Sequence, residues 1–152
     1  MVVDSNLLLL LFLGGFKPNR ISSHKRLSAF TKEDFDLLVR FLNGFSRIVT
    51  TPNILTEVSN LSSGVPQGKR GIYFRWFTSR IQLLAEEYIP SGTAMANRWA
   101  RFGLTDAAIA EIASSRYLVL TDDFPLSQSL QRAGIDAINF NNLRGMAWRK
   151  RL

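Results

Sequence analysis

The sequence predicts an α/β domain built around a mostly parallel sheet. Short apolar runs of strand length alternate along the chain with longer segments whose apolar residues recur at helical spacing. This alternation is typical of a parallel sheet covered by helices. With 152 residues, 46% of them hydrophobic, the chain has the length and composition of one domain with a single core. We expect residues 1–145 to form that domain and residues 146–152 to form a basic C-terminal tail.

The expected strands are short and apolar, and the expected helices carry recognisable start or stop signals. Strands are predicted at residues 1–3, 46–50, 117–121 and 135–140. Helices are predicted at residues 6–13, 31–45, 51–61, 72–88, 93–101, 104–115 and 124–133. Thr51 and Pro52 form a typical helix start, with a capping hydroxyl followed by proline at the first helical position. The pair Gly14–Gly15 is expected to stop the first helix.

The N-terminal segment VVDSNLLLLLFLGG, residues 2–15, is predicted to be part of the fold rather than a signal or an anchor. A signal peptide needs a basic region before its apolar stretch, and Asp4 stands there instead. A membrane-spanning helix needs about 20 apolar residues, whereas this run is interrupted at Gly14. The same two features disfavour a peripheral membrane protein. We therefore expect a central strand followed by a buried helix.

Composition narrows the chemistry that this chain can perform. It has no cysteine, which excludes disulfides, thiolate metal sites and cysteine nucleophiles. It has a single histidine, which any Ser-His-Asp arrangement or imidazole-rich metal site would have to use. The histidine, His24, lies in the polar stretch SSHKR and is expected in an exposed loop. Carboxylates are therefore the groups on which any catalysis would depend. The net charge of +7 and the pI near 10.4 favour a polyanionic partner, with nucleic acid as the first choice.

The acidic residues, 12 in all, fall into two groups. Solvated faces and helix starts account for the first group, which comprises Glu33, Asp34, Asp36, Glu86, Glu87, Glu111 and Asp136. The second group follows strands or borders buried helix faces and comprises Asp4, Glu57, Asp106, Asp122 and Asp123. Each member of the second group also has a plain structural explanation, as a helix cap, a turn residue or a partly exposed side chain.

Chain position brings most of the second group to one edge of the predicted sheet. The carboxyl ends of parallel strands share one edge, so Asp4 and the pair Asp122–Asp123 belong there, and Glu57 can reach it. Asp106 begins the helix before the strand YLVLT and is placed at the opposite edge by this argument, unless the preceding segment bends back. Clustered carboxylates need a cation among them, and the hard ions Mg²⁺ and Mn²⁺ prefer oxygen ligands. A carboxylate–metal crevice on a basic domain indicates phosphodiester hydrolysis.

Four segments resemble, in order, the four acidic blocks of the PIN domain, a nuclease fold that includes the VapC-type toxins. These segments are VVDSNLLL, TTPNILTEVSNL, GLTDAAIAEIA and VLTDDFPLSQSLQRAGIDAINF, which together span about residues 2–140. The resemblance implies a three-layer α/β/α sandwich with Mg²⁺- or Mn²⁺-dependent endoribonuclease activity. It also implies that the chain could be the toxin of a toxin–antitoxin pair.

The resemblance assigns roles to individual residues and places Asp106 in the site. The implied catalytic acids are Asp4, Glu57, Asp106 and Asp123. Asp4, Asp106 and Asp123 would hold the metal ion, Glu57 would complete its shell, and Asp122 would be an auxiliary ligand. Two further polar side chains, Asn6 and Thr121, would hydrogen-bond these carboxylates and hold their rotamers.

The expected partner is RNA, held through its phosphates by basic residues. The candidates are Arg20, Lys25, Arg26, Arg75, Arg98 and Arg101, with Lys69, Arg70 and 149–151 as further basic positions. Trp76 and Trp99 could stack on bases, but burial is the expectation we favour. The resemblance further implies a cytoplasmic protein with a cognate antitoxin. A homodimer is expected from the resemblance and from the aromatic helices, and no membrane association is expected from Asp4 and the short apolar run. The alternative function is a non-catalytic RNA-binding or scaffold domain that retains the fold.

Overall fold

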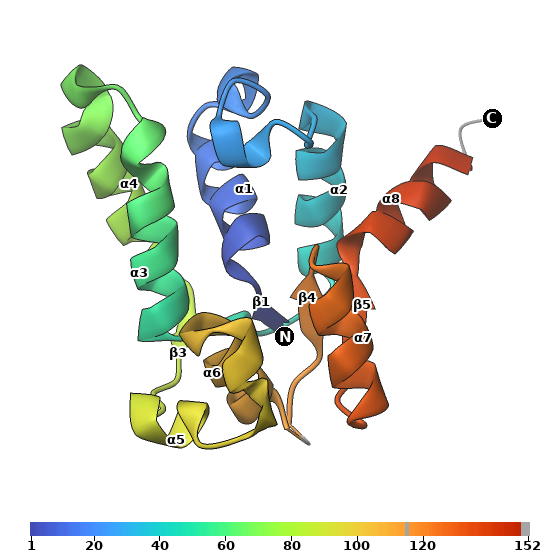
Figure 1. The fold of residues 1–152 in the computed structure, drawn as a ribbon. Coiled ribbons are helices and arrows are strands. Elements are labelled where there is room, and N and C mark those ends of the chain that lie inside the picture. The colour runs from blue at the N-terminus through green and yellow to red at the C-terminus, as the bar shows by residue number, and fades with distance from the viewer. Residues whose placement is uncertain (115, 150–152) are drawn as a thin grey trace.

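The computed structural model describes residues 1–114 and 116–149, whose strands form one five-stranded parallel sheet. The strand order is β3-β2-β1-β4-β5, and every neighbouring pair is parallel. The strands are β1 (Val2–Val3), β2 (Val49–Thr50), β3 (Ala85–Glu86), β4 (Val119–Thr121) and β5 (Ala137–Asn139). Helices flank this sheet in an α/β/α sandwich, which confirms the predicted fold class (Figure 1). The N-terminal valines form the central strand, as expected.

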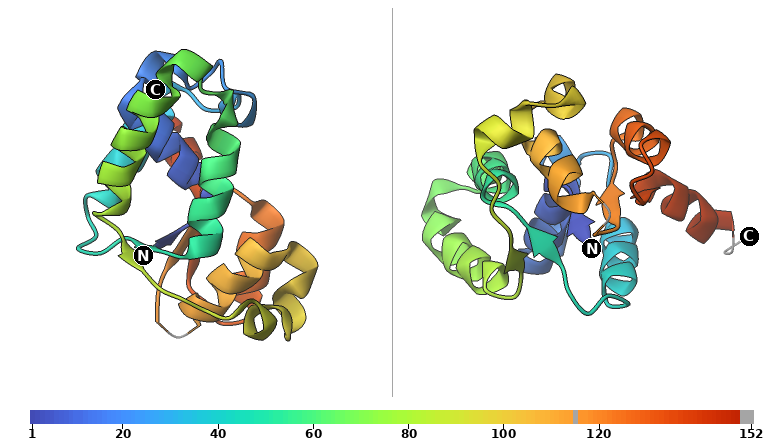
Figure 2. Two further views of the ribbon diagram at one scale, coloured as in Figure 1. Left: turned by 90° about the vertical axis from the view of Figure 1, so that its left-hand side faces the viewer. Right: turned by 90° about the horizontal axis from the view of Figure 1, so that it is seen from below.

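The helices gather into groups around the strands. They are α1 (Ser5–Phe16), α2 (Lys32–Leu42), α3 (Pro52–Leu61), α4 (Arg70–Ile81), α5 (Ser91–Met95), α6 (Leu104–Ala113), α7 (Phe124–Arg132) and α8 (Phe140–Arg149). Short 3₁₀ turns lie between them: η1 (Pro18–Arg20), η2 (Lys25–Leu27), η3 (Ser62–Gly64), η4 (Gln67–Lys69) and η5 (Arg98–Phe102). In Figure 1, α1 to α4 stand side by side above the sheet, and α5 and α6 lie below. Helix α8 leads away from the body of the molecule (Figure 2).

The leucine-rich helix α1 forms the centre of the core. Leu7, Leu9 and Leu10 are fully buried, and Phe12 packs edge-on against Phe77 of α4. Burying one such side chain stabilises the fold by about 1.5–3 kcal/mol. The run is thus a buried helix, as predicted. In the part of the chain that the structure describes, no helix has the length and apolarity that crossing a bilayer would require.

The two glycines in α1 do not stop the helix, contrary to the prediction. Helix α1 continues through both of them to Phe16. They serve close packing instead, because a Cβ on Gly14 would overlap the ring of Phe35 from α2. A Cβ on Gly15 would come within 2.9 Å of the ring of Trp76 from α4. Sequence spacing alone does not distinguish a glycine that ends a helix from one that lets a neighbouring helix approach.

The segment 72–88 and the last strand also differ from their predictions. The predicted long helix ends at Ile81, and Ala85–Glu86 form the edge strand β3 beside β2. A two-residue edge strand carries no alternating pattern, so only its pairing with Thr50 and Val49 reveals it. The predicted last strand ends at Asn139, and residues 140–149 form α8. Within the expected basic tail, residues 146–149 are thus helical, and 150–152 lie outside the described residues.

The packing role of Gly14 predicts that alanine substitutions at two helical glycines change the free energy of unfolding in opposite directions. We expect Gly14→Ala to reduce the free energy of unfolding by about 1–3 kcal/mol, because the methyl group would overpack the ring of Phe35. Gly145→Ala in α8 is the matched control, since a Cβ there has no neighbour within 4 Å. We expect it to stabilise the protein by about 0.5–1 kcal/mol through helix propensity. Urea unfolding measures both, and equal effects would contradict the packing role.

Candidate functional site

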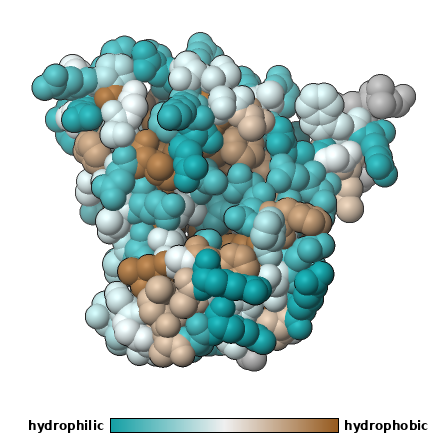
Figure 3. All heavy atoms as spheres, in the orientation of Figure 1, coloured by the Kyte–Doolittle hydropathy of each residue, from teal (hydrophilic) through white to brown (hydrophobic). Residues whose placement is uncertain are grey.

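Five acidic side chains line one pocket at the carboxyl edge of the sheet. Its volume is about 120 Å³, and we name it the carboxylate pocket. Its lining residues are Asp4, Ser5, Asn6, Arg26, Glu57, Asp106, Asp122 and Asp123. They come from the start of α1, the loop before α2, helix α3, the first turn of α6 and the turn after β4. Figure 3 shows hydrophilic side chains gathered over the middle of this face, between α3 and α7.

Asp4 connects the two central strands beneath the pocket. Its Oδ1 accepts a hydrogen bond from the Leu7 amide at 2.9 Å, so Asp4 is the N-terminal cap of α1. Its Oδ2 accepts a hydrogen bond from the Asp122 amide, also at 2.9 Å, at the end of β4. Asp4 is only 5% exposed. The structural explanation for this acid, a helix cap, is therefore correct, although each oxygen keeps further lone-pair capacity.

The other polar side chains of the pocket bond to one another across elements. Ser5 Oγ donates to Glu57 Oε2 at 3.0 Å, which ties α1 to α3. Asn6 Nδ2 donates to Asp122 Oδ1 at 3.3 Å. Ser5 is a site residue that the sequence did not predict, although its position directly after Asp4 was an available signal.

Asp123 has a second role that resembles that of Asp4. Its Oδ1 caps α7 by accepting from the Leu126 amide at 2.8 Å, and it is exposed. Its own amide donates to Thr121 Oγ1 at 3.0 Å, so Thr121 shapes the turn that carries both aspartates. Thr121 itself is fully buried. The turn after β4 is therefore defined by local hydrogen bonds.

Asp106 lies at the same edge as the other acids, and the placement at the opposite edge is wrong. Helix α6 runs in the direction opposite to β4, which follows it, so its first turn lies at the carboxyl end of that strand (Figure 1). Asp106 sits in that first turn and lines the carboxylate pocket. The cap position of α6 is Gly103, with no side-chain cap, so the carboxylate of Asp106 is not used for capping.

Because the carboxylates of the pocket are close together and partly buried, ionisation of Asp4 and of Asp106 is less favourable than in water. Burial raises the pKa of Asp4 well above its ordinary value, and the charge of Asp122 raises it further. Hydrogen bonds from Thr121 and from two backbone amides act in the opposite direction on this pKa. Burial also raises the pKa of Asp106 to about 7, together with the charges of Asp123, Glu57 and Asp122. Among the described residues that line the pocket, Arg26 is the one with a positive charge.

The donor types suit a hard cation, although the side chains are not gathered as a finished metal site. All five acids offer oxygen ligands, and Asn6 Oδ1 is buried without a hydrogen-bond partner. In residues 1–114 and 116–149, however, no three histidine, cysteine, aspartate or glutamate side chains converge as a metal-binding group. Two of the carboxylates also cap helices, as shown above. Metal binding would therefore require side-chain rotation within the pocket.

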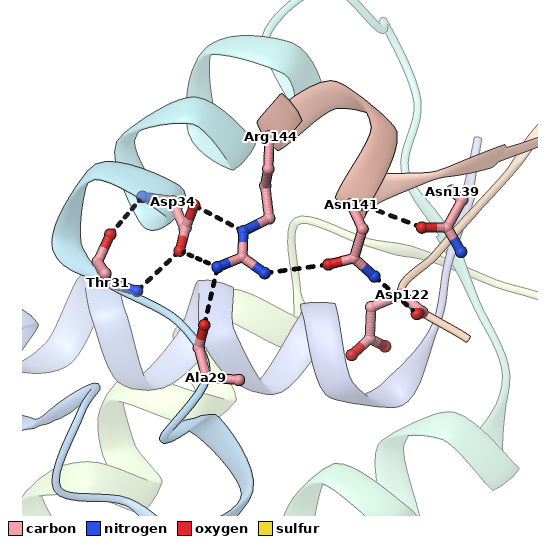
Figure 4. Close-up of polar contacts among 7 residues, drawn as sticks. All are labelled: Ala29, Thr31, Asp34, Asp122, Asn139, Asn141 and Arg144. Carbon is pink, nitrogen blue, oxygen red and sulfur yellow. Dashed lines mark hydrogen bonds and ion pairs between the residues drawn. The ribbon is translucent and has the colours of Figure 1, made fainter. Parts of the chain in front are cut away.

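A buried ion pair lies behind the pocket and corrects the prediction for Asp34. We expected a solvated helix start, but Asp34 is 1% exposed. Arg144 of α8 binds it through two hydrogen bonds of 2.9 Å, from Nε and from Nη2 (Figure 4). Asp34 also forms a capping box with Thr31 at the start of α2. Arg144 further donates to the Ala29 carbonyl at 2.8 Å.

The same arginine reaches the turn of the carboxylate pocket through Asn141. Arg144 Nη1 donates to Asn141 Oδ1 at 3.0 Å, and Asn141 Nδ2 donates to the Asp122 carbonyl at 3.0 Å (Figure 4). The Asn141 amide in turn donates to Asn139 Oδ1 at 2.9 Å. Helix α8 thereby connects α2 to the turn that holds Asp122. The stretch NFNN, residues 139–142, begins at the last residue of β5 and was a signal of polar groups at this edge.

The predicted RNA-binding residues fall into different surroundings. Arg26 lines the carboxylate pocket, and Arg20 lines a separate pocket at the far end of α1. Lys25 and Arg75 are exposed and belong to neither lining. Arg98 and Arg101 lie over the rings of Trp99 and Phe102, at 4.9 and 4.8 Å from the centroids. The structure therefore brings only one of these six basic residues to the acids.

Aromatic residues and the histidine have packing roles. Trp99 is 6% exposed, and Trp76 donates its ring N–H to the Phe12 carbonyl at 3.0 Å, as expected for packed tryptophans. His24 is half-buried rather than exposed, which corrects the prediction. Its Nε2 lies 3.0 Å from the Leu61 carbonyl, and its Nδ1 accepts from the Arg26 amide. These bonds hold the loop before α2 against the end of α3.

Neither models of known protein families nor comparisons with curated proteins and with solved structures give a match to this chain. A functional proposal therefore rests on the fold class, the carboxylate pocket and the resemblance of the four sequence segments.

The ion pair behind the pocket generates a stability prediction. We expect Arg144→Ala to lower the free energy of unfolding by about 3 kcal/mol, because the buried Asp34 would lose its bidentate partner. Arg116→Ala is the matched control, since that arginine is 59% exposed and pairs with Glu87. We expect the control to cost less than about 1 kcal/mol. Urea unfolding measures both. If the two variants lose similar free energies of unfolding, the buried pair with Asp34 stabilises the protein no more than an exposed pair does.

The raised pKa of Asp106 generates a pH prediction for the metal-free protein. Because its pKa rises from 3.8 to about 7 on folding, the folded state keeps a proton that the unfolded chain has released. Its contribution to stability is present below pH 3.8 and is lost as the pH rises to about 7. Asp106→Asn removes this loss. We therefore expect the variant to gain stability relative to wild type between about pH 5 and about pH 8.

Chemical unfolding at the two pH values tests this expectation. The exposed residue Asp136 offers the control, Asp136→Asn, for which we expect no comparable gain. A difference between wild type and Asp106→Asn that stays constant with pH would contradict the raised pKa.

Proposed function

We propose that this chain is a metal-dependent endoribonuclease of the PIN-domain type. The observation that supports the proposal most is the carboxylate pocket, in which acids from four separate segments line one space at the carboxyl edge of the sheet. A protein that only binds phosphate gains nothing from concentrated negative charge. The net charge of +7 supports a polyanionic substrate despite these acids. The four sequence segments that resemble the PIN domain contain all five of these acids.

In this proposal, some lining residues bind a cation and another contacts the RNA. Asp4, Asp106 and Asp123 would hold Mg²⁺ or Mn²⁺, with Glu57 and Asp122 beside them. A bound ion would orient the phosphodiester and lower the pKa of the attacking water. Among the chain's own groups, Arg26 would contact a phosphate. Asn6 Oδ1 would provide a neutral oxygen that has no partner at present.

The cation would also relieve the electrostatic cost of the pocket. A positive charge near Asp4 and Asp106 opposes the shifts that burial and neighbouring carboxylates produce in their pKa values. This relief is a physical reason for the pocket to favour a divalent ion. The toxin role, a cognate antitoxin and a cytoplasmic location are proposed from the resemblance, and a homodimer from the resemblance and the aromatic helices.

A non-catalytic RNA-binding or scaffold domain is the second candidate. The observation that favours it is the structural use of the acids, since Asp4 and Asp123 both cap helices. The absence of a converged metal-binding group among the described residues points the same way. In this case the carboxylates would serve the fold, and the basic surface alone would bind RNA.

Cleavage of structured RNAs in the presence of Mg²⁺ or Mn²⁺ distinguishes the two candidates. We expect wild-type activity that EDTA abolishes and that Asp106→Asn reduces by about a hundredfold, in keeping with the loss of a metal-shell residue. Asp4→Asn should reduce it as well. Because Asp4 also accepts two backbone hydrogen bonds, thermal unfolding must show that this variant folds.

Asp136→Asn is the matched control, because this exposed acid lies outside the carboxylate pocket. It should cleave RNA at the wild-type rate. Intact RNA with either metal, together with equal RNA binding by wild type and both pocket variants, would refute the ribonuclease and favour the scaffold.

A further inference from the structure

A second pocket lies at the far end of α1, where positive side chains from two distant segments meet. We name it the cationic pocket; its volume is about 40 Å³. Lys17 and Arg20 reach it from the end of α1 and from η1, and Lys69 reaches it from η4. Ser23, His24 and Gly64 also line it, and no acidic residue does so among the residues that the structure describes. The rest of the lining is apolar and consists of Leu13, Phe16, Val65 and Pro66. The sequence gives no sign that Lys17 and Lys69 are neighbours, because 51 residues lie between them.

The backbone, rather than the lysine side chains, brings these charges together. Helix α1 ends at Phe16 and places Lys17 at its C-terminal cap. On the other side, His24 is bonded to the Leu61 carbonyl, and Gly64 packs against its ring. A Cβ on Gly64 would lie 3.0 Å from two atoms of that ring, so the loop that leads to Lys69 is held close.

Three cationic side chains in one small pocket repel one another, and an anion bound among them would offset this repulsion. The pKa of Lys17 is lowered, first by hydrogen bonding with Lys69, and then by the charge of Lys69, by desolvation and by the charge of Arg20. The lysine ammonium groups act as point charges, and a guanidinium adds a planar fork that suits phosphate oxygens. The chemistry of the pocket therefore matches a phosphate group.

A basic segment connects the cationic pocket to the carboxylate pocket. Arg20 and His24 line the first, and Arg26 lines the second. His24 and Arg26 are two residues apart, which limits the separation of their Cα atoms to about 7 Å. Lys25 lies between them and is exposed. Residues 20–26 thus run from one pocket to the other with positive charges along the way.

We propose that the cationic pocket binds a backbone phosphate of single-stranded RNA and that residues 20–26 guide the strand from there to the carboxylate pocket. The choice of RNA rests on the proposed function, whereas the phosphate chemistry rests on the pocket itself. Contacts of this kind add affinity and register without reading sequence. The pocket would therefore act on every RNA that the protein binds.

The salt dependence of RNA binding tests this proposal. The double variant Lys17→Gln/Lys69→Gln and wild type are titrated with a short single-stranded oligoribonucleotide in EDTA. If each lysine contributes one phosphate contact, the slope of log K against log salt becomes less steep by about 1.4, or about 0.7 per contact. The double variant Arg40→Gln/Arg132→Gln removes the same charge from exposed positions outside the pocket lining. It should keep the wild-type slope.

The alternative outcomes each overturn part of the proposal. If the slope is unchanged in the lysine variant, or changes equally in the arginine control, the proposal that this pocket binds RNA is wrong. Thermal stabilisation by inorganic phosphate that only the lysine variant loses, with RNA binding unaffected, would show a free-anion site instead. If polyglutamate displaces RNA and binds with higher affinity than RNA at the same salt concentration, the pocket would instead bind an acidic protein partner.

The same comparison separates this proposal from the ribonuclease. Because the titration contains EDTA, it reports binding without hydrolysis. RNA binding that depends on Lys17 and Lys69, without metal-dependent cleavage, would refute the ribonuclease alone. Cleavage that depends on Asp106, with binding indifferent to the two lysines, would refute the role of the cationic pocket alone.

Discussion

The two hydrogen bonds accepted by the Asp4 carboxylate are the interaction on which the rest of the structure depends. One comes from the Leu7 amide and starts the buried helix α1, and the other comes from the Asp122 amide at the end of β4. The carboxylate thus joins the two central strands to the core helix at a single point. Its burial is costly, and these backbone donors offset part of that cost. Because Asp4 is held this way, the turn that carries Asp122 and Asp123 lies directly beside it.

This anchoring creates an electrostatic imbalance along the molecule. Among the described residues, one end of α1 faces a pocket of five carboxylates and one arginine, and the other end faces a pocket with three cationic side chains and no acid. Each pocket lacks the charge that would balance it. A divalent cation in the first and a phosphate in the second would restore the balance, and a nucleic acid with its counterions supplies both kinds of charge. The proposed function and the proposed RNA path rest on this complementarity.

Sequence reasoning succeeded where a residue's role follows from its neighbours in the chain. Asp4, Asp122 and Asp123 directly follow strands, and parallel strands end at one edge, so their shared location could be predicted. For Asp106, the strand-order argument alone pointed to the opposite edge, whereas the family resemblance placed this residue with the other acids, where the structure has it. Sequence reasoning failed for Asp34, whose partner Arg144 lies 110 residues away. The strand β3 could not be seen, since two residues at a sheet edge carry no pattern.

The sequence by itself determined the α/β class, the central valine strand, the buried leucine helix and the set of acids available for chemistry. These depend on hydrophobic periodicity and on local capping, which act over a few residues. Only the tertiary structure decided that Arg144 meets Asp34 and that Lys17 meets Lys69. It also decided that Gly14 is a packing contact for Phe35 rather than a helix stop. The physical reason is that electrostatic and packing contacts depend on distance in space, which the order of residues in a chain does not contain.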